Sequence, residues 1–160
     1  MMSPMSNPGV KFPPPFIYAT GFIIAWLLET RVMRIHIVGG DASTTSLEIA
    51  GLILATIGLL LVFWGLITFA RARTGILPMR PATQIVDHGP YSFTRNPMYT
   101  GLAITFLGAA FFLNYGWMLV MLPLVMIAIF SFVIKREERY LTSAFPEEYG
   151  RYRRKVRRWL

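Results

Sequence analysis

Two long stretches of this chain contain no charged residue, and they constrain the fold more than any other feature of the sequence. No Asp, Glu, Lys or Arg occurs from Ile49 to Ala70 or from Asn96 to Ile134. A helix needs about 20 apolar residues to cross the hydrocarbon core of a bilayer, which is about 30 Å thick. The first stretch is long enough for one crossing and the second for two short ones. The sequence therefore predicts an all-α, polytopic membrane protein.

An apolar run before these stretches, Phe16 to Leu28, adds a further candidate span. No small-x-small cleavage site follows it, because Glu29, Thr30 and Arg31 come next, so we interpret the run as a retained span rather than a cleaved signal peptide. A single domain over residues 1–160 then has about four transmembrane helices, at approximately 14–34, 47–70, 97–113 and 117–134. The last two form a tight hairpin, because Asn114, Tyr115 and Gly116 supply a turn. A cytoplasmic helical tail is expected at 135–160.

Local signals support these helices. Asn96 is expected to cap the third helix through its side-chain oxygen, and Pro97 suits the first helical position. Small residues four apart on one helix face let helices approach closely in lipid. We expect this packing role, and no catalytic one, for Gly51, Ala55, Gly101, Thr105 and Ala109.

The basic residues indicate the orientation of the bundle. Arg71 to Arg95 contains four arginines, and the part from Lys135 onward contains nine Lys or Arg. Loops rich in Lys and Arg stay in the cytoplasm, so both termini are predicted inside, in a bacterial inner membrane. The net charge of +8 is interpreted as topology rather than nucleic-acid binding, because a basic nucleic-acid domain does not need long charge-free stretches. The run RYRRKVRRW is expected to bind anionic lipid headgroups, with cytoplasmic retention alone as the alternative.

Metal and thiol chemistry find no support in the sequence. There is no cysteine, which excludes disulfides and thiolate sites. His36 and His88 are too isolated to make a metal site, which requires several convergent ligands.

The hairpin is expected to gather polar residues at its cytoplasmic end. Arg95, Asn96 and Tyr99 lie at its entrance, and Glu137 and Glu138 follow its exit. The arginine could bind a carboxylate, and the start of a helix adds exposed amides. A glutamate could accept from an ammonium or a ribose diol, and a tyrosine ring could face a sulfonium. Such a set suits S-adenosylmethionine, although snorkelling charges and interfacial tyrosines give the same composition.

Two motifs resemble a known family. GPYSFTRNPMYTG at residues 89–101, and EERYLTSAFPEEYGRYRRKV at residues 137–156, are similar to the bacterial branch of the isoprenylcysteine carboxyl methyltransferase and phospholipid methyltransferase superfamily. The resemblance covers approximately residues 74–159. It implies an S-adenosylmethionine pocket closed by the loop and the tail. The site residues it implies are Gly89, Pro90, Tyr91, Arg95, Asn96, Tyr99, Glu137, Glu138, Tyr149 and Tyr152.

The chain departs from this family at two places. Better-known members have histidine where this chain has Asn96, and an amide cannot serve as a base. The family's Phe-Gly in the tail is Phe145-Pro146 here, which predicts a new helix from Pro146. Eukaryotic members also carry extra N-terminal spans, so their prenylated-protein substrate is not carried over. Tyr149 and Tyr152 either cover the cofactor or pack the tail onto the bundle.

The function implied is an S-adenosylmethionine-dependent methyltransferase of the membrane that acts on a lipid or lipophilic small molecule. Arg95 and Glu138 are the catalytic candidates, and an ammonium acceptor would require Glu137, Glu138 or water to take a proton. Adjacent residues on a helix diverge by about 100°, so the two glutamates cannot face a ligand equally. The alternatives are an NADPH-dependent membrane reductase of related fold and a non-catalytic subunit or assembly factor of a membrane complex.

Overall fold

A computed structural model of the chain describes residue 9 and residues 13–39, 44–72 and 82–159, and every regular element in these ranges is helical. The elements in order are α1 (Pro14–Leu27), a π-helical turn (Leu28–Val32), α2 (Thr45–Arg71), a 3-10 turn (Gly89–Ser92), α3 (Pro97–Leu113), α4 (Gly116–Ile129), a second π-helical turn (Phe130–Ile134), α5 (Lys135–Ala144) and α6 (Pro146–Lys155). The predicted all-α class is confirmed. The last apolar helix runs on without a break, because α4, the π-helical turn and α5 form one continuous helix.

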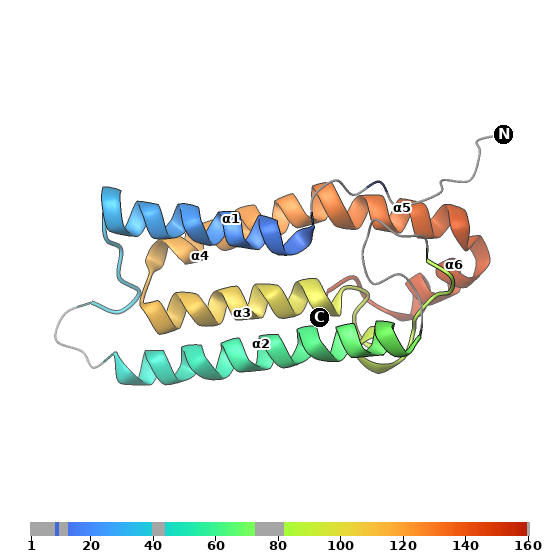
Figure 1. Cartoon of the computed structure of the whole chain (residues 1–160), viewed down its shortest axis with the longest axis horizontal. Coiled ribbons are helices and arrows are strands. Elements are labelled where there is room, and N and C mark those ends of the chain that lie inside the picture. The colour runs from blue at the N-terminus through green and yellow to red at the C-terminus, as the bar shows by residue number, and fades with distance from the viewer. Residues whose placement is uncertain (1–8, 10–12, 40–43, 73–81, 160) are drawn as a thin grey trace.

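The helices lie in two layers, with α1 and α4 in one and α2 and α3 in the other (Figure 1). The starts of α1 and α3 and the ends of α2 and α4 lie on the same side of the bundle, where α5 and α6 extend it. The turn between α3 and α4, the end of α1 and the start of α2 lie at the opposite end. This alternation is the one that the predicted topology requires. The orientation of the bundle in a membrane stays a prediction.

Glycines hold α2 and α3 in backbone contact. A Cβ built on Gly58 would lie 2.5 Å from the carbonyl oxygen of Gly101, and one built on Gly101 would lie 2.6 Å from the carbonyl oxygen of Gly58. Gly51 and Gly108 face each other in the same way, at 2.6 Å in both directions. The contact therefore repeats every seven residues along both helices. Of the small residues predicted to pack here, Ala109 instead lies against the main apolar core.

The end of the bundle opposite the tail is closed by buried polar groups. Glu29 is 2% exposed, and its carboxylate accepts a hydrogen bond from the backbone amide of Ile35 at 2.8 Å. Asn114 adopts the left-handed conformation, with φ of 54°, which ends α3 and turns the chain into α4. Its amide side chain accepts from Ile37 N and donates to Val38 O, both at 2.9 Å. The hairpin turn is thereby tied to the α1–α2 connection.

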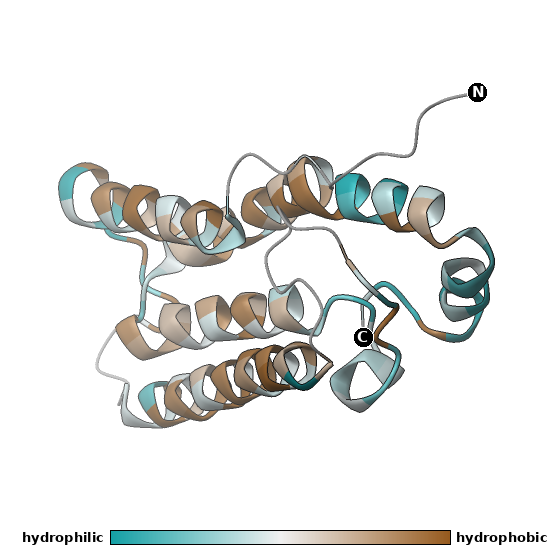
Figure 2. Cartoon of the chain, turned by 45° about the vertical axis from the view of Figure 1, so that its right-hand side comes forward, coloured by the Kyte–Doolittle hydropathy of each residue, from teal (hydrophilic) through white to brown (hydrophobic). Residues whose placement is uncertain are grey.

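Apolar side chains cover the outside of the bundle. Among the described residues two helices are long and apolar enough to cross a membrane, Thr45–Arg71 and Gly116–Ala144, and α3 is apolar but shorter. Only 17% and 28% of the most apolar 18-residue stretch of each helix is buried, whereas the core helix of a soluble protein is mostly buried. Hydrophobic colouring dominates α1 to α4, whereas hydrophilic colouring gathers on α5 and α6 (Figure 2). The count of four spans stays a prediction.

Candidate functional site

The helical hairpin brings its entrance and exit together, as the sequence predicts. Arg95 lies two residues before the start of α3, and Glu138 lies in the first turn of α5. A guanidinium nitrogen of Arg95 lies 3.1 Å from a carboxylate oxygen of Glu138, and the two side chains are only 10% and 16% exposed. Water screens the attraction within a pair of so little exposure less than the attraction within a surface pair. We call the side chains around this pair, Arg95, Tyr99, Glu137, Glu138 and Arg158, the polar cluster.

The two adjacent glutamates face different partners. The hydroxyl of Tyr99 donates to Glu137 at 2.7 Å, while Glu138 faces Arg95. Burial raises the pKa of Glu137 to about 7, and the neighbouring charge of Glu138 adds to this effect, while the hydrogen bond from Tyr99 opposes it. Glu137 is thus a group that can gain or lose a proton near neutral pH, at the point where α5 leaves the apolar part of the bundle.

Asn96 does not have its predicted capping role. Its side chain makes no cap hydrogen bond to α3, and its amide nitrogen donates instead to the carbonyl oxygen of Arg158 at 3.0 Å. Pro97 does begin the helix. Asn96 contributes to the start of α3 only through its backbone, because its carbonyl oxygen accepts a hydrogen bond from the Thr100 amide at 2.9 Å. The cap prediction fails because the side chain is taken by a segment more than 60 residues away.

That segment, Val156 to Trp159, is extended and lies along the entrance to α3. The backbone amide of Arg95 donates to the carbonyl oxygen of Arg157 at 2.9 Å, and Thr94 forms an isolated parallel bridge with Arg157. The hydroxyl of Thr94 donates to the carbonyl oxygen of Arg158 at 3.2 Å. We call residues 156–159 the strap.

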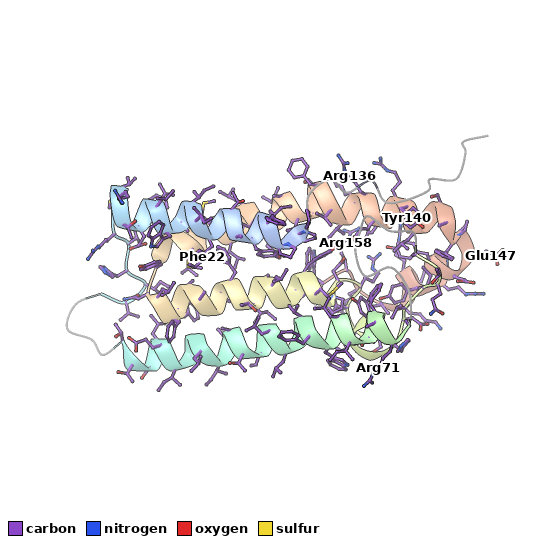
Figure 3. The ribbon with its side chains drawn as sticks, in the orientation of Figure 1. Phe22, Arg71, Arg136, Tyr140, Glu147 and Arg158 are labelled. Atoms are coloured by element: carbon purple, nitrogen blue, oxygen red, sulfur yellow. The ribbon has the colours of Figure 1, made fainter. Side chains whose placement is uncertain are left out.

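Arg158 of the strap completes the polar cluster. Its Nε and Nη2 donate to the two carboxylate oxygens of Glu138 at 2.8 and 2.9 Å. Its guanidinium also lies 5.1 Å from the ring centre of Phe130. Figure 3 shows Arg158 between the α4–α5 helix and the start of α3. The sequence offered no sign of this role, because Arg158 is one of several arginines in the basic run, and it was assigned with them to lipid headgroups.

The loop before α3 contributes a buried tyrosine. Gly89 has φ of +61°, and a Cβ there would lie 3.0 Å from the hydroxyl of Thr68 on α2, so this turn requires glycine. Pro90 and Tyr91 are buried beneath it. The ring of Tyr91 packs edge-on against Phe69, with ring centres 4.8 Å apart.

The tail tyrosines pack against this loop and against Arg95. The hydroxyl of Tyr152 donates to the carbonyl oxygen of Tyr91 at 2.8 Å, and Arg95 donates to the hydroxyl of Tyr149 at 3.3 Å. Both side chains are buried in a second apolar core with Tyr91 and Val156. Burial raises the pKa of Tyr149 above its ordinary value, and Glu138 adds to the rise. These contacts agree with the packing alternative, and Tyr149 in addition touches the polar cluster.

Two buried polar atoms in this region have no hydrogen-bond partner. They are the hydroxyl of Tyr91 and the Nε of Arg95. Buried donors are usually paired, because an unpaired one loses its hydration without compensation. Both belong to residues that the family resemblance assigns to the cofactor site.

Two further features of the described residues concern possible sites away from the polar cluster. No group of three or more His, Asp or Glu in the described ranges could hold a metal ion. An open hollow of about 490 Å³ lies between α6 and the segment before α3, lined by Ile85, Asp87, Ser92, Glu148, Arg151, Tyr152, Lys155 and Val156. It shares only Tyr152 with the predicted site and does not include the polar cluster.

Comparison with known proteins adds a family match. The sequence profile of the family described as phospholipid methyltransferase matches residues 47–148, which is more than half of the chain. Protein-S-isoprenylcysteine O-methyltransferase of Schizosaccharomyces pombe is 38% identical over 72 residues, which are 45% of this chain and 30% of that protein. A probable protein-S-isoprenylcysteine O-methyltransferase of Oryza sativa subsp. indica is 31% identical over 108 residues, 66% of this chain and 56% of that protein.

An uncharacterized protein of Haemophilus influenzae is 42% identical over 65 residues, 39% of this chain and 100% of that protein. The chain aligns with little more than half, or less, of the length of the two named relatives. No solved structure matches the chain significantly. The matched range contains both hairpin motifs up to the start of α6, and it excludes α1 and the strap.

Proposed function

We propose a function from one premise: the chain belongs to the phospholipid methyltransferase family, in the superfamily that its two motifs predicted. On this premise the protein is an integral membrane methyltransferase that uses S-adenosylmethionine and acts on a lipid or lipophilic small molecule. The observation that carries the proposal is the polar cluster, in which an arginine and an acidic pair meet beside two buried, unpaired donors. The membrane orientation that accompanies it has the cluster at the inner leaflet and both termini in the cytoplasm.

The residues of the cluster fit this cofactor. The unpaired Nε of Arg95 and the unpaired hydroxyl of Tyr91 are donors for a carboxylate or a ribose oxygen. Glu137 and Glu138 are acceptors for an ammonium or a diol. When bound, S-adenosylmethionine supplies a methyl group on a positively charged sulfur. Asn96, Gly89 and Pro90 shape the wall, and Tyr149 and Tyr152 cover the cluster from the side of α6.

The protein contributes alignment, exclusion of water and, for some acceptors, one proton transfer. Displacement at a sulfonium needs no acid to assist the leaving thioether, so Arg95 and Glu138 act by holding the reactants in line. A carboxylate or thiolate acceptor needs no base. An ammonium acceptor must lose a proton, and Glu137 is the better candidate, because its pKa of about 7 suits a general base while Glu138 is held between two guanidinium groups.

The basic face of the tail is proposed to bind anionic headgroups. The buried residues of α6 are Tyr149 and Tyr152, which form the face of the helix that packs inward. Its cationic side chains are exposed: Arg151, Arg153, Arg154 and Lys155. Each Lys or Arg near an anionic surface contributes about 1 kcal/mol. Binding to vesicles that contain phosphatidylglycerol should therefore exceed binding to pure phosphatidylcholine and should weaken with salt.

Calorimetry on the detergent-purified protein tests the proposed class directly. S-adenosylmethionine should bind, NADPH should not, and Arg95→Ala should abolish the binding. The matched control is Arg139→Ala, which removes an exposed cation of the same end of α5 and should leave affinity unchanged. Binding of NADPH alone would indicate the reductase, and binding of neither would indicate a non-catalytic subunit. Unchanged affinity in Arg95→Ala would show that the site lies elsewhere.

The acceptor requires a separate experiment. The protein is incubated with methyl-labelled S-adenosylmethionine and a total lipid extract, and the labelled product is located by chromatography and mass spectrometry. A label on a headgroup amine, an isoprenoid carboxylate or a lipophilic thiol would identify the acceptor class. Absence of label from every lipid, despite cofactor binding, would contradict a lipid acceptor.

A further inference from the structure

The strap contacts both halves of the proposed site, the segment before α3 and the first turn of α5. Its carbonyl oxygens accept hydrogen bonds from the backbone amide of Arg95 and from the hydroxyl of Thr94 before α3, and it reaches α5 through the side chain of Arg158. Trp159 packs against the main apolar core, which contains residues of α1, α3 and α4. The strap therefore bridges the hairpin entrance and the hairpin exit, where a ligand that touches both must bind.

Arg158 donates to the carboxylate oxygens of Glu138 that an ammonium or hydroxyl group of such a ligand would need as acceptors. Glu138 is contacted by Arg95 at 3.1 Å and by two nitrogens of Arg158 at 2.8 and 2.9 Å. Three guanidinium nitrogens therefore face the roughly four lone-pair sites of this carboxylate, and two of the three belong to Arg158. An ammonium or hydroxyl donor of a ligand can reach Glu138 fully only after Arg158 has left.

Electrostatics disfavour simultaneous occupancy as well. Arg95 and Arg158 bring two positive charges against the single charge of Glu138. S-adenosylmethionine has one net positive charge, from its sulfonium, ammonium and carboxylate. Arg158 adds one positive charge to the cluster, which disfavours a cation of that kind whether or not Glu137 is ionised, and this contribution is lost when Arg158 moves away.

We infer that the strap is an internal competitor: Arg158 holds Glu138 in a closed state, and the cofactor binds only after the strap has released the carboxylate. The choice of cofactor rests on the proposed function. Arg158 is about one third exposed, at 37%, whereas Arg95 and Glu138 are nearly enclosed, so Arg158 is the member of the cluster that can leave toward solvent. The apparent dissociation constant is then the intrinsic one divided by the fraction of open molecules.

Arg158→Ala and Arg157→Ala form the matched pair that tests this competition. Both remove one positive charge from the strap, but the Arg157 side chain is exposed and its residue contacts α3 through its backbone. Calorimetry should show S-adenosylmethionine binding about three- to fivefold tighter to Arg158→Ala than to the wild type, which is the upper part of the range expected for loss of a partly exposed ion pair. Arg157→Ala should leave affinity within about twofold of the wild type.

Hydrogen exchange supplies a readout that needs no ligand. The Arg95 amide donates to the strap, so its exchange reports whether the strap is in place. It should exchange several-fold faster in Arg158→Ala than in Arg157→Ala or the wild type.

The outcomes separate this inference from the proposed function. Equal or weaker cofactor binding in Arg158→Ala overturns the competition, since Arg158 would then be an ordinary wall of the pocket, while the proposed function survives. Unchanged exchange at Arg95 overturns the anchoring of the strap by Arg158. If no variant binds S-adenosylmethionine, the proposed function fails and the competition for that cofactor fails with it.

Discussion

The contact between α2 and α3 and the polar cluster at the start of α3 hold the same helix by opposite means. The first joins two backbones through glycines that repeat every seven residues, with no room for a single Cβ. The second joins side chains from three separate segments through charge pairs and hydrogen bonds. The contact between the helices is therefore sensitive to added volume, and the cluster is sensitive to lost charge. We expect the first to matter most for the stability of the bundle, and we propose that the second matters most for ligand binding.

Gly101→Ala should give the largest effect on stability. The added Cβ would lie 2.6 Å from the Gly58 carbonyl oxygen, a backbone atom that cannot move without shifting α2. Overpacking of this kind destabilises by about 1–3 kcal/mol, and we expect the upper part of that range in thermal or denaturant unfolding in detergent.

Gly150→Ala is the matched control for this substitution. A Cβ on Gly150 of α6 has no neighbour closer than 3.8 Å, that neighbour being the end of the Arg154 side chain. The same chemical change should stabilise by about 0.5–1 kcal/mol, because alanine is the better helix former. If both variants changed the free energy of unfolding in the same direction, the contrast between the glycine contact and the tail would be wrong.

Glu138→Gln tests the other half of the comparison. It conserves volume and removes the charge that faces Arg95 and Arg158. Binding of S-adenosylmethionine should weaken by about tenfold or more, whereas the unfolding free energy should fall by only about 1–2 kcal/mol. Glu147→Gln, at an exposed position of α6, should change neither. A loss of stability as large as that of Gly101→Ala would show that the cluster is structural rather than functional.

The same contrast explains how much could be inferred from the sequence. The helix bounds followed from charge-free stretches, from Pro97 and Pro146 and from the Asn114 turn, because these signals act within a few residues of the structure they determine. The hairpin then fixed the approach of Arg95 to Glu138, since a tight turn between two helices of similar length brings their far ends together.

What the sequence did not predict depends on contacts between distant segments. The side chain of Asn96 binds the carbonyl oxygen of Arg158 rather than its own helix. The glycine contact involves Gly58 and Gly108, which lie outside the four-residue spacing of small residues. Tyr18 of α1 is a further case, because its hydroxyl donates to the Tyr99 carbonyl at 2.9 Å from 81 residues away. No local pattern distinguishes Asn96 and Tyr18 from their neighbours, whereas the seven-residue spacing of the glycines is visible in the sequence but does not say which helix they face.

The ionisation of Glu137 should make the contribution of the polar cluster to stability depend on pH, which the glycine contact should not do. Its folded-state pKa of about 7 lies above the ordinary value of 4.5, so the folded protein binds the proton more tightly than the unfolded chain. The stability that this proton contributes is fully present below about pH 4.5 and is lost as the pH rises through about 7. Glu137→Gln should flatten the fall in unfolding free energy over this window. An unchanged slope would place the titrating group elsewhere.

Tyr91→Phe should give the smallest effect on stability, and its sign is the informative part. The hydroxyl of Tyr91 is buried without a hydrogen-bond partner, so removing it deletes an uncompensated polar group. The unfolding free energy should stay unchanged or rise by up to about 1 kcal/mol. If the hydroxyl serves the cofactor, the same variant should bind S-adenosylmethionine about three- to tenfold more weakly, which corresponds to one lost hydrogen bond. Gain of stability with loss of affinity is the signature of a group kept for binding; unchanged affinity would remove Tyr91 from the site and leave it as a core residue beside Phe69.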